Sequence, residues 1–163
     1  MIDDLYSAKI LRLVANIPHA GRLAAPDASA EKIAKLCGSK ITVDVTVKGG
    51  RVTGFAQDVK ACALGQASAA VLGANIIGAD LNEIEVARDA LYAMLKANGP
   101  HPEGRFSELS VLEPVKDYPA RHASTLLAFE AALEAVRSAT ASKATASKAT
   151  LAVQSRTSRA GAA

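Results

Sequence analysis

The chain has 163 residues, of which 50% are hydrophobic but only 4% aromatic, so its core must be built from aliphatic side chains and alanine. No apolar run reaches the roughly 18 residues of a membrane span, and no secretory signal opens the chain. We therefore expect a cytoplasmic protein with reduced thiols, in which two cysteines suggest metal or redox chemistry.

The formal charge of +3 is unevenly distributed along the chain. All 16 acidic residues lie at or before Glu134, whereas the residues after position 138 include only basic charges. We divide the chain into a domain of residues 1–137 and a low-complexity basic tail of residues 138–163. The tail is expected to be disordered, although its alanines and lysines would permit the preceding helix to continue. Without a basic folded face and stacking aromatics, we expect no nucleic-acid binding.

The predicted elements follow an α+β order, with a hairpin between helices. The first helix is expected from Asp3 to Ala15, and the segment 20–35 is either a loop or an irregular strand. The remaining elements are, in chain order, strands Ile41–Val47 and Arg51–Val59, helices Leu64–Ile77 and Leu81–Ala97, a loop over 101–119, and a helix Arg121–Val136. The last helix should bury a set of apolar side chains: Leu126, Leu127, Phe129, Leu133 and Val136. This order predicts a small antiparallel β-sheet of about three strands packed against several helices.

The two cysteines are placed symmetrically about the predicted hairpin turn. Cys37 lies twelve residues before Gly49, and Cys62 lies twelve residues after Gly50. An antiparallel hairpin brings such positions together at its open end, although a bulge at Gly54 would shift the register by one residue. This spacing leaves three alternatives: a shared functional site, two unrelated core cysteines, or a disulfide.

Each cysteine also has surroundings that favour a thiolate. Cys62 precedes a helix start, where unpaired N–H groups and the helix dipole attract negative charge. Lys35, Lys40 and Lys60 lie close to the cysteines in the sequence and would favour the same anion. The alternative is that Cys62 is a small buried hydrophobe beneath the helix.

The histidines are weaker candidates than the cysteines. His122 stands at the start of the last predicted helix and is the third candidate ligand, although a histidine there is most often a solvated neighbour of the helix cap. His19 and His101 lie in proline-containing loops, so we interpret both as surface residues.

Two segments carry a family resemblance: LCGSKITVDVTVKGGRVTGFAQDVKACALGQASAAVLGANIIG and PVKDYPARHASTLLAFEAAL. Together they resemble the iron–sulfur cluster scaffold family, of the IscU and NifU N-terminal domain type, over roughly residues 1–136. The resemblance implies a scaffold or carrier without enzymatic turnover that holds a labile iron–sulfur cluster, [2Fe–2S] above all. The sequence departs from the family pattern at two positions: Ser39 replaces an aspartate, and Ala123 replaces the third cysteine.

The resemblance also implies a set of site residues and partners. Cys37, Cys62 and His122 would be metal ligands, with Ser39 and Lys60 at the rim of the site. A cysteine desulfurase and recipient apo-proteins would be partners, and a chaperone would bind the loop of Pro114, Val115 and Lys116. The sequence also leaves a homodimer open.

Two alternative functions remain open from the sequence. Two cysteines, a histidine and a water would suit tetrahedral zinc, as in a SufU-like protein that accepts sulfur from a desulfurase. The loss of two ligand positions also fits a degenerate homologue that acts as a protein adaptor and carries no cofactor.

Overall fold

A three-stranded antiparallel sheet, in the order β1-β2-β3, forms the centre of the fold. The computed structural model describes residues 5–160, with side chains as far as Ser155. The elements are α2 (Ala8–Ala15), β1 (Ala28–Ala34), β2 (Ser39–Lys48), β3 (Arg51–Lys60), α3 (Ala63–Asn75), α4 (Leu81–Lys96), the 3₁₀ helices η1 (Gly104–Asp117) and η2 (Pro119–Arg121), and α5 (His122–Ala160). This order confirms the predicted α+β class. Of the ambiguous segment 20–35, Ala28–Ala34 is the strand β1 and residues 20–27 are irregular.

The β2–β3 hairpin turns at Gly49 and Gly50, which both adopt positive φ (61° and 75°). Positive φ at both central residues suits a turn that matches the twist of the two strands, and glycine adopts it without strain. The register shifts between Thr46 and Val47, so that Thr46 pairs with Gly54 and Lys40 with Lys60. This is the one-residue bulge that the sequence allowed at Gly54.

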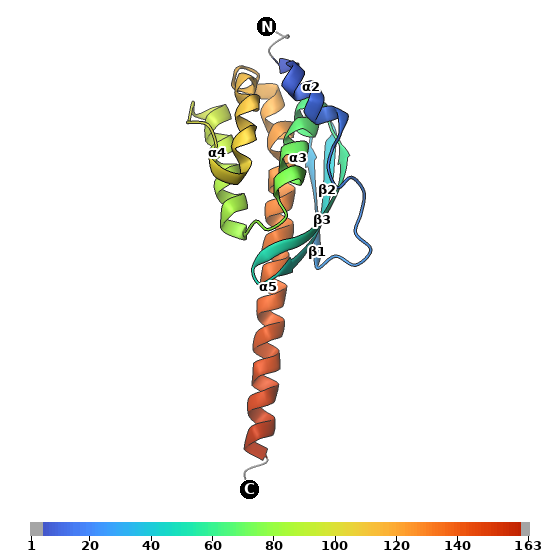
Figure 1. The fold of residues 1–163 in the computed structure, drawn as a ribbon, viewed down its shortest axis with the longest axis vertical. Coiled ribbons are helices and arrows are strands. Elements are labelled where there is room, and N and C mark those ends of the chain that lie inside the picture. The colour runs from blue at the N-terminus through green and yellow to red at the C-terminus, as the bar shows by residue number, and fades with distance from the viewer. Residues whose placement is uncertain (1–4, 161–163) are drawn as a thin grey trace.

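Alternate residues of β2 supply the apolar face of the sheet. Ile41, Val43 and Val45 are completely buried, and α5 packs against both β1 and β2. Figure 1 shows α5 running along the sheet and continuing beyond it to the C-terminus. All of the apolar α5 side chains that were predicted to face inward are buried: Leu126, Leu127, Phe129, Leu133 and Val136.

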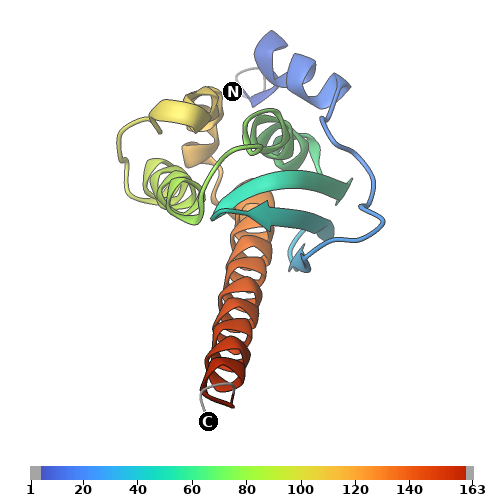
Figure 2. The ribbon, with the colours of Figure 1, turned by 60° about the horizontal axis from the view of Figure 1, so that its bottom comes forward.

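The opposite face of β2 carries a buried carboxylate, Asp44, which is inaccessible to solvent. Its oxygens accept hydrogen bonds from Arg22 Nε (2.7 Å), Arg22 Nη2 (3.0 Å), the Ser29 hydroxyl (2.5 Å) and the Leu23 N–H (3.0 Å). The segment between α2 and β1 passes along the sheet at this point (Figure 2). Asp44 therefore fastens this otherwise irregular segment to the sheet.

Two helix starts are capped by side chains. Ser7 caps α2 by accepting a hydrogen bond from Ile10 N–H, and the start expected at Asp3 lies outside the described residues. Asp80 caps α4 in the capping box that the sequence predicted: its side chain accepts from the Glu83 N–H, and the Glu83 carboxylate accepts from the Asp80 N–H.

The expected loop over residues 101–119 is wrong for most of its length, because η1 occupies Gly104–Asp117. Its buried side chains recur at every third position: Phe106, Leu109, Leu112 and Val115. A 3₁₀ helix has three residues per turn, so this spacing aligns Leu109, Leu112 and Val115 on one face, whereas Phe106 lies at a kink where the backbone is not helical (φ −106°, ψ 23°).

The C-terminal segment differs from the expected disordered tail. In the structure α5 continues as a helix to Ala160, and no glycine or proline interrupts residues 122–160. Beyond Thr140 the side chains described are exposed, so this extension lacks a core. Lys143 Nζ lies 3.1 Å from Asp27 and joins the first part of the extension to the body. The division into a domain of residues 1–137 and a tail stays a prediction.

Candidate functional site

Cys37 and Cys62 lie at the open end of the β2–β3 hairpin, as the sequence predicted. Cys37 occupies the turn between β1 and β2 and is exposed. The turn is closed by a 2.8 Å hydrogen bond from Gly38 N–H to Ala34 O, and Gly38 has a positive φ of 70°. Cys62 is the N-cap residue of α3 and is partly buried. Both thiols are free.

Ser39 connects the two cysteines. Its hydroxyl oxygen lies 3.0 Å from Cys37 Sγ and accepts a 3.3 Å hydrogen bond from the Cys62 N–H. Because the oxygen accepts from Cys62, the single hydroxyl hydrogen is available to Cys37. Ser39 is only 3% exposed. The residue that replaces an aspartate of the family pattern thus holds the strand end against the helix start.

Ser124, on the first turn of α5, is a site residue that the sequence analysis did not single out. Its hydroxyl lies 3.4 Å from Cys62 Sγ and donates a 3.1 Å hydrogen bond to Arg121 O. It is 1% exposed, whereas its neighbour Ala123 is exposed. The family pattern drew attention to position 123, and only the packing of α5 identifies position 124 as the one that contacts Cys62.

The pKa of Cys37 is lowered from its ordinary value. The Ser39 hydroxyl has the largest effect, and burial opposes it; the Ser39 N–H, the Ser124 hydroxyl and the Arg121 charge add to the lowering. A thiolate with several hydrogen-bond donors is a better nucleophile and metal ligand than the thiol at neutral pH.

A basic rim borders the thiols. Lys40 and Lys60 are direct partners across the last pair of the β2–β3 ladder, and Lys35 is exposed in the β1–β2 connection. Like charges placed directly opposite one another destabilise a sheet. Glu31 Oε2 lies 3.9 Å from Lys40 Nζ and offsets part of this repulsion, and a negative charge at the thiols would offset more of it.

His122 is buried (5% exposed) and its Nε2 points at backbone carbonyls. Nε2 lies 3.0 Å from Val115 O and 3.2 Å from Lys116 O, so it donates its hydrogen to this loop. Among the described residues, no group of three or more histidine, cysteine or acidic side chains could hold a metal ion. The structure thus brings together Cys37, Cys62 and Ser39 but engages His122 elsewhere.

The other predicted positions are placed as follows. Lys60 is exposed at the end of β3, consistent with the rim. Pro114, Val115 and Lys116 lie in η1, where Val115 is completely buried. Lys116 Nζ lies 3.1 Å from Glu113 Oε1, and Glu113 also pairs with His101. His19 and His101 are exposed, as predicted.

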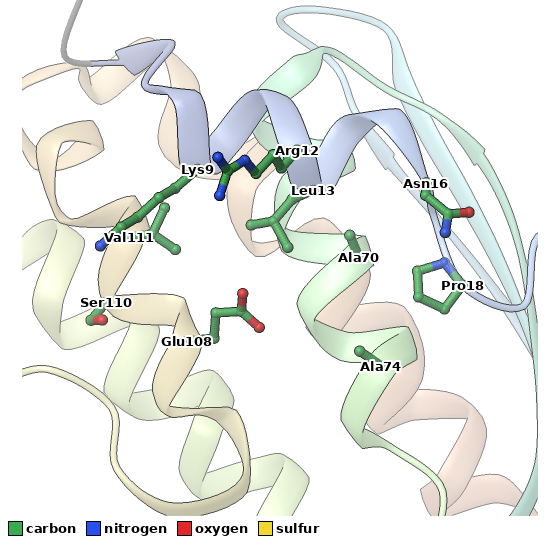
Figure 3. Close-up of a pocket in the computed structure, with 10 residues that line it drawn as sticks. All are labelled: Lys9, Arg12, Leu13, Asn16, Pro18, Ala70, Ala74, Glu108, Ser110 and Val111. Carbon is green, nitrogen blue, oxygen red and sulfur yellow. The ribbon is translucent and has the colours of Figure 1, made fainter.

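A separate cavity of about 610 Å³ lies between α2, α3 and η1 (Figure 3). Its walls include Leu13, Ala70 and Val111, with Arg12 and Glu108 as charged groups on opposite sides. Neither cysteine lines it. The cavity therefore lacks the soft thiolate ligands that distinguish the hairpin end.

Comparisons with known proteins identify the family to which this fold belongs. Residues 5–125, about three quarters of the chain, match the NifU-like N-terminal domain. The chain belongs to the NifU-like N-terminal domain family. As a NifU-like domain it contains both cysteines, Ser39 and Ser124 within the matched residues. No helix in the described part is both long and apolar enough to cross a membrane.

Relatives extend the match in sequence and in structure. The iron–sulfur cluster assembly scaffold protein IscU of Thermotoga maritima is 29% identical over 101 residues, covering 62% of this chain and 70% of that protein. A nitrogen-fixing NifU-like protein (N-terminal) from Brucella abortus is 54% identical, with a TM-score of 0.83 over 85% of this chain and 96% of that chain. A putative scaffold protein for the SUF system from Fervidobacterium islandicum, at 22% identity and TM-score 0.74, covers 81% and 96% and shares the fold.

Proposed function

We propose that this NifU-like domain is an assembly scaffold or carrier for iron–sulfur clusters, and that the cluster is its cargo. The observation that carries the proposal is the pairing of Cys37 and Cys62 through Ser39, with hydrogen bonds of 3.0 and 3.3 Å. Two thiolates held beside a basic rim suit iron and sulfide, because the thiolate complex is negatively charged.

The candidate ligands are the two cysteine sulfurs and one histidine nitrogen. Cys37 and Cys62 are the thiolate ligands. His122 is at most a supplementary ligand, because its Nε2 would first have to release Val115 O and Lys116 O. A ligand set this small would hold a cluster loosely. Loose binding suits a cargo that must leave for another protein.

The partners follow from the same role. A cysteine desulfurase would supply sulfur, and recipient apo-proteins would take the finished cluster in the cytoplasm, where thiols stay reduced. A chaperone would act at Pro114, Val115 and Lys116. Because Val115 is buried, recognition of its side chain would require η1 to open. No turnover chemistry is assigned to the chain itself.

A second candidate function is sulfur acceptance, with zinc as the bound metal. The observation that favours it is the exposure of Cys37 together with the lowered pKa of its thiol. An accessible thiolate could take a sulfur atom from a persulfide donor. In that case Cys37 would carry persulfide without iron.

The test is a metal and sulfide count on protein purified without oxygen, before and after incubation with iron and sulfide. A scaffold should gain iron matched by sulfide and a sulfur-to-iron charge-transfer band. Cys37→Ser and Cys62→Ser should each abolish this binding, whereas His122→Ala should only weaken it.

Other outcomes separate the alternatives. Zinc alone, with persulfide on Cys37, would favour sulfur acceptance. No metal in any condition, with both cysteine variants unaffected in partner binding, would favour an adaptor without a cofactor.

A further inference from the structure

The cavity between α2, α3 and η1 combines an apolar wall with two opposite charges. Leu13, Ala70 and Val111 form the apolar wall, and Ala70 is only 1% exposed. Arg12 lies on the α2 side and Glu108 on the η1 side, with both side chains at the space between the two helices (Figure 3). The volume of about 610 Å³ lies within the range of about 300–1,000 Å³ that is typical of small-molecule sites.

These two charges have no ionic partner in the part of the chain that the structure describes. Neither the Arg12 guanidinium nor the Glu108 carboxylate forms an ion pair or a side-chain hydrogen bond there, with each other or with a third residue. The next carboxylate of η1, Glu113, is by contrast paired with both His101 and Lys116. An arginine and a carboxylate that border one cavity without meeting leave room for a ligand that carries both complementary charges.

We propose that this cavity binds a small zwitterion with an aliphatic body, an α-amino acid or a dipeptide, through Arg12 and Glu108. The planar guanidinium of Arg12 can donate two parallel hydrogen bonds to the carboxylate of the ligand. The Glu108 carboxylate can accept from its ammonium group. Leu13, Ala70 and Val111 would cover the aliphatic part, which gains free energy by leaving water. A molecule with only one of the two charges would leave one protein group unpaired, so the pair selects for zwitterions.

A ligand bound in this way would connect α2 to η1. Ile10 is the buried residue of α2, whereas Arg12 and Leu13 face the cavity. Glu108 and Val111 of η1 border the same space. The ligand would therefore bridge two helices, and a movement of η1 away from α2 would release it. Neither cysteine lines the cavity, so this binding requires no metal at the thiols.

The first experiment titrates the full chain, without metal, with zwitterions and with analogues that each lack one charge. The zwitterions are L-leucine and the dipeptide alanyl-leucine, which differ in the separation of their charges. Isocaproate lacks the ammonium group of leucine, and leucinamide lacks its carboxylate. We expect at least one zwitterion to shift the amide NMR signals of the cavity residues saturably, with a Kd of about 1 mM or lower. Either analogue should bind about tenfold more weakly than leucine, because one charged hydrogen bond is lost.

Two variants assign the ends of the ligand. Arg12→Gln should weaken the binding of leucine and isocaproate about tenfold but leave that of leucinamide unchanged. Glu108→Gln should weaken leucine and leucinamide to the same degree but should not weaken isocaproate. Both side chains are exposed and unpaired, so both variants should fold. Lys48→Gln and Asp89→Asn remove the same kinds of charge at exposed positions that do not line the cavity, and should leave every affinity unchanged.

Hydrogen exchange measures the connection between α2 and η1. If only the closed form binds, leucine at ten times its Kd should slow amide exchange in η1 about tenfold. The exchange of the β2 amides, which lie away from the cavity, is the internal control and should not change. Glu108→Gln at the same leucine concentration should lose most of the slowing.

Several results would overturn the zwitterion site. These are equal binding of leucine and both analogues, binding that neither Arg12→Gln nor Glu108→Gln weakens, and the absence of any saturable change at millimolar concentrations of both zwitterions. Saturable binding that leaves η1 exchange unchanged would overturn the bridge between the two helices. The measurements contain no iron or sulfide, so none of these results alters the proposed scaffold function.

Discussion

At the scale of single residues, Ser39 links the strand end to the helix start. Its hydroxyl lies 3.0 Å from Cys37 Sγ while its oxygen accepts from the Cys62 N–H. A carboxylate at this position would add a negative charge to the site. A hydroxyl instead donates to Cys37 and stabilises the thiolate without adding charge to the site.

Replacing Ser39 by alanine should raise the pKa of Cys37, because the hydroxyl is the largest cause of its lowered value. The rate of thiol alkylation reports the thiolate fraction, so its pH profile should move to higher pH in Ser39→Ala. Cys62→Ser leaves one reactive thiol in both proteins and makes the profiles comparable. A profile that Ser39→Ala leaves unchanged would contradict the role of this hydroxyl.

At the scale of elements, the approach of α3 to α5 brings Cys62 and Ser124 together. A Cβ built on Gly65 would lie 2.9 Å from Ala61 Cβ and 3.0 Å from Ser124 O. Since one of these neighbours is backbone, a side chain here would force the two helix starts apart. Gly65 therefore permits the contact between Cys62 and Ser124.

Gly65→Ala should weaken the site and cost about 1–3 kcal/mol of unfolding free energy, the usual effect of overpacking a close contact. We expect lower iron binding after reconstitution and a lower midpoint of urea unfolding. Ala74→Ser, on the exposed part of the same helix, is the control and should change neither measurement. Full iron binding in a destabilised Gly65→Ala protein would show that this contact does not control the site.

A second element-scale feature is the carboxylate of Asp44, which fastens the segment before β1 to the sheet. Its pKa is lowered, chiefly by the Arg22 guanidinium against the opposing effect of burial. A depressed pKa in the folded state stabilises the protein above the unfolded value of about 3.9, and this stability is lost as the pH falls through the folded pKa.

Asp44→Asn should therefore lower the free energy of unfolding at pH 7 by about 2–4 kcal/mol, because the amide donates where donors already point. It should also flatten the loss of stability between neutral and acidic pH. Asp89→Asn, at an exposed position of α4, serves as control. Urea unfolding at several pH values measures both effects. If the unfolding free energy of Asp44→Asn falls with decreasing pH as steeply as that of the wild type, the acid sensitivity does not come from Asp44.

The sequence predicted the hairpin, α3, α4 and the meeting of the two cysteines because each has a local pattern. Alternation gives the strands, Asp80 and Glu83 give the capping box, and symmetry about the turn brings Cys37 near Cys62. It did not predict η1, whose three-residue period is easily mistaken for a loop. The contacts of Ser124 and His122 depend on packing between segments that are distant in the sequence, so no local sequence pattern predicts them.

At the scale of the whole molecule, α5 serves two purposes. Its first part is a core helix whose start carries His122 and Ser124, and the apolar side chains that follow cover the sheet. Its second part, beyond Thr140, extends away from the body (Figure 1). The alanines and lysines of the second part permit a helix, but only the first part has apolar residues at core spacing.

Removing residues 142–163 should therefore have little effect on the fold or the thiol site. The loss includes the pair of Lys143 with Asp27, which at about half exposure of the lysine is expected to contribute less than about 1 kcal/mol. We expect the urea midpoint and the iron content after reconstitution to match those of the full chain within that limit. Lys143→Ala in the full chain isolates the contribution of the ion pair. A truncated chain that unfolds much more easily than Lys143→Ala would mean that the extension stabilises the body by contacts beyond this pair, and that α5 acts as one cooperative unit along its length.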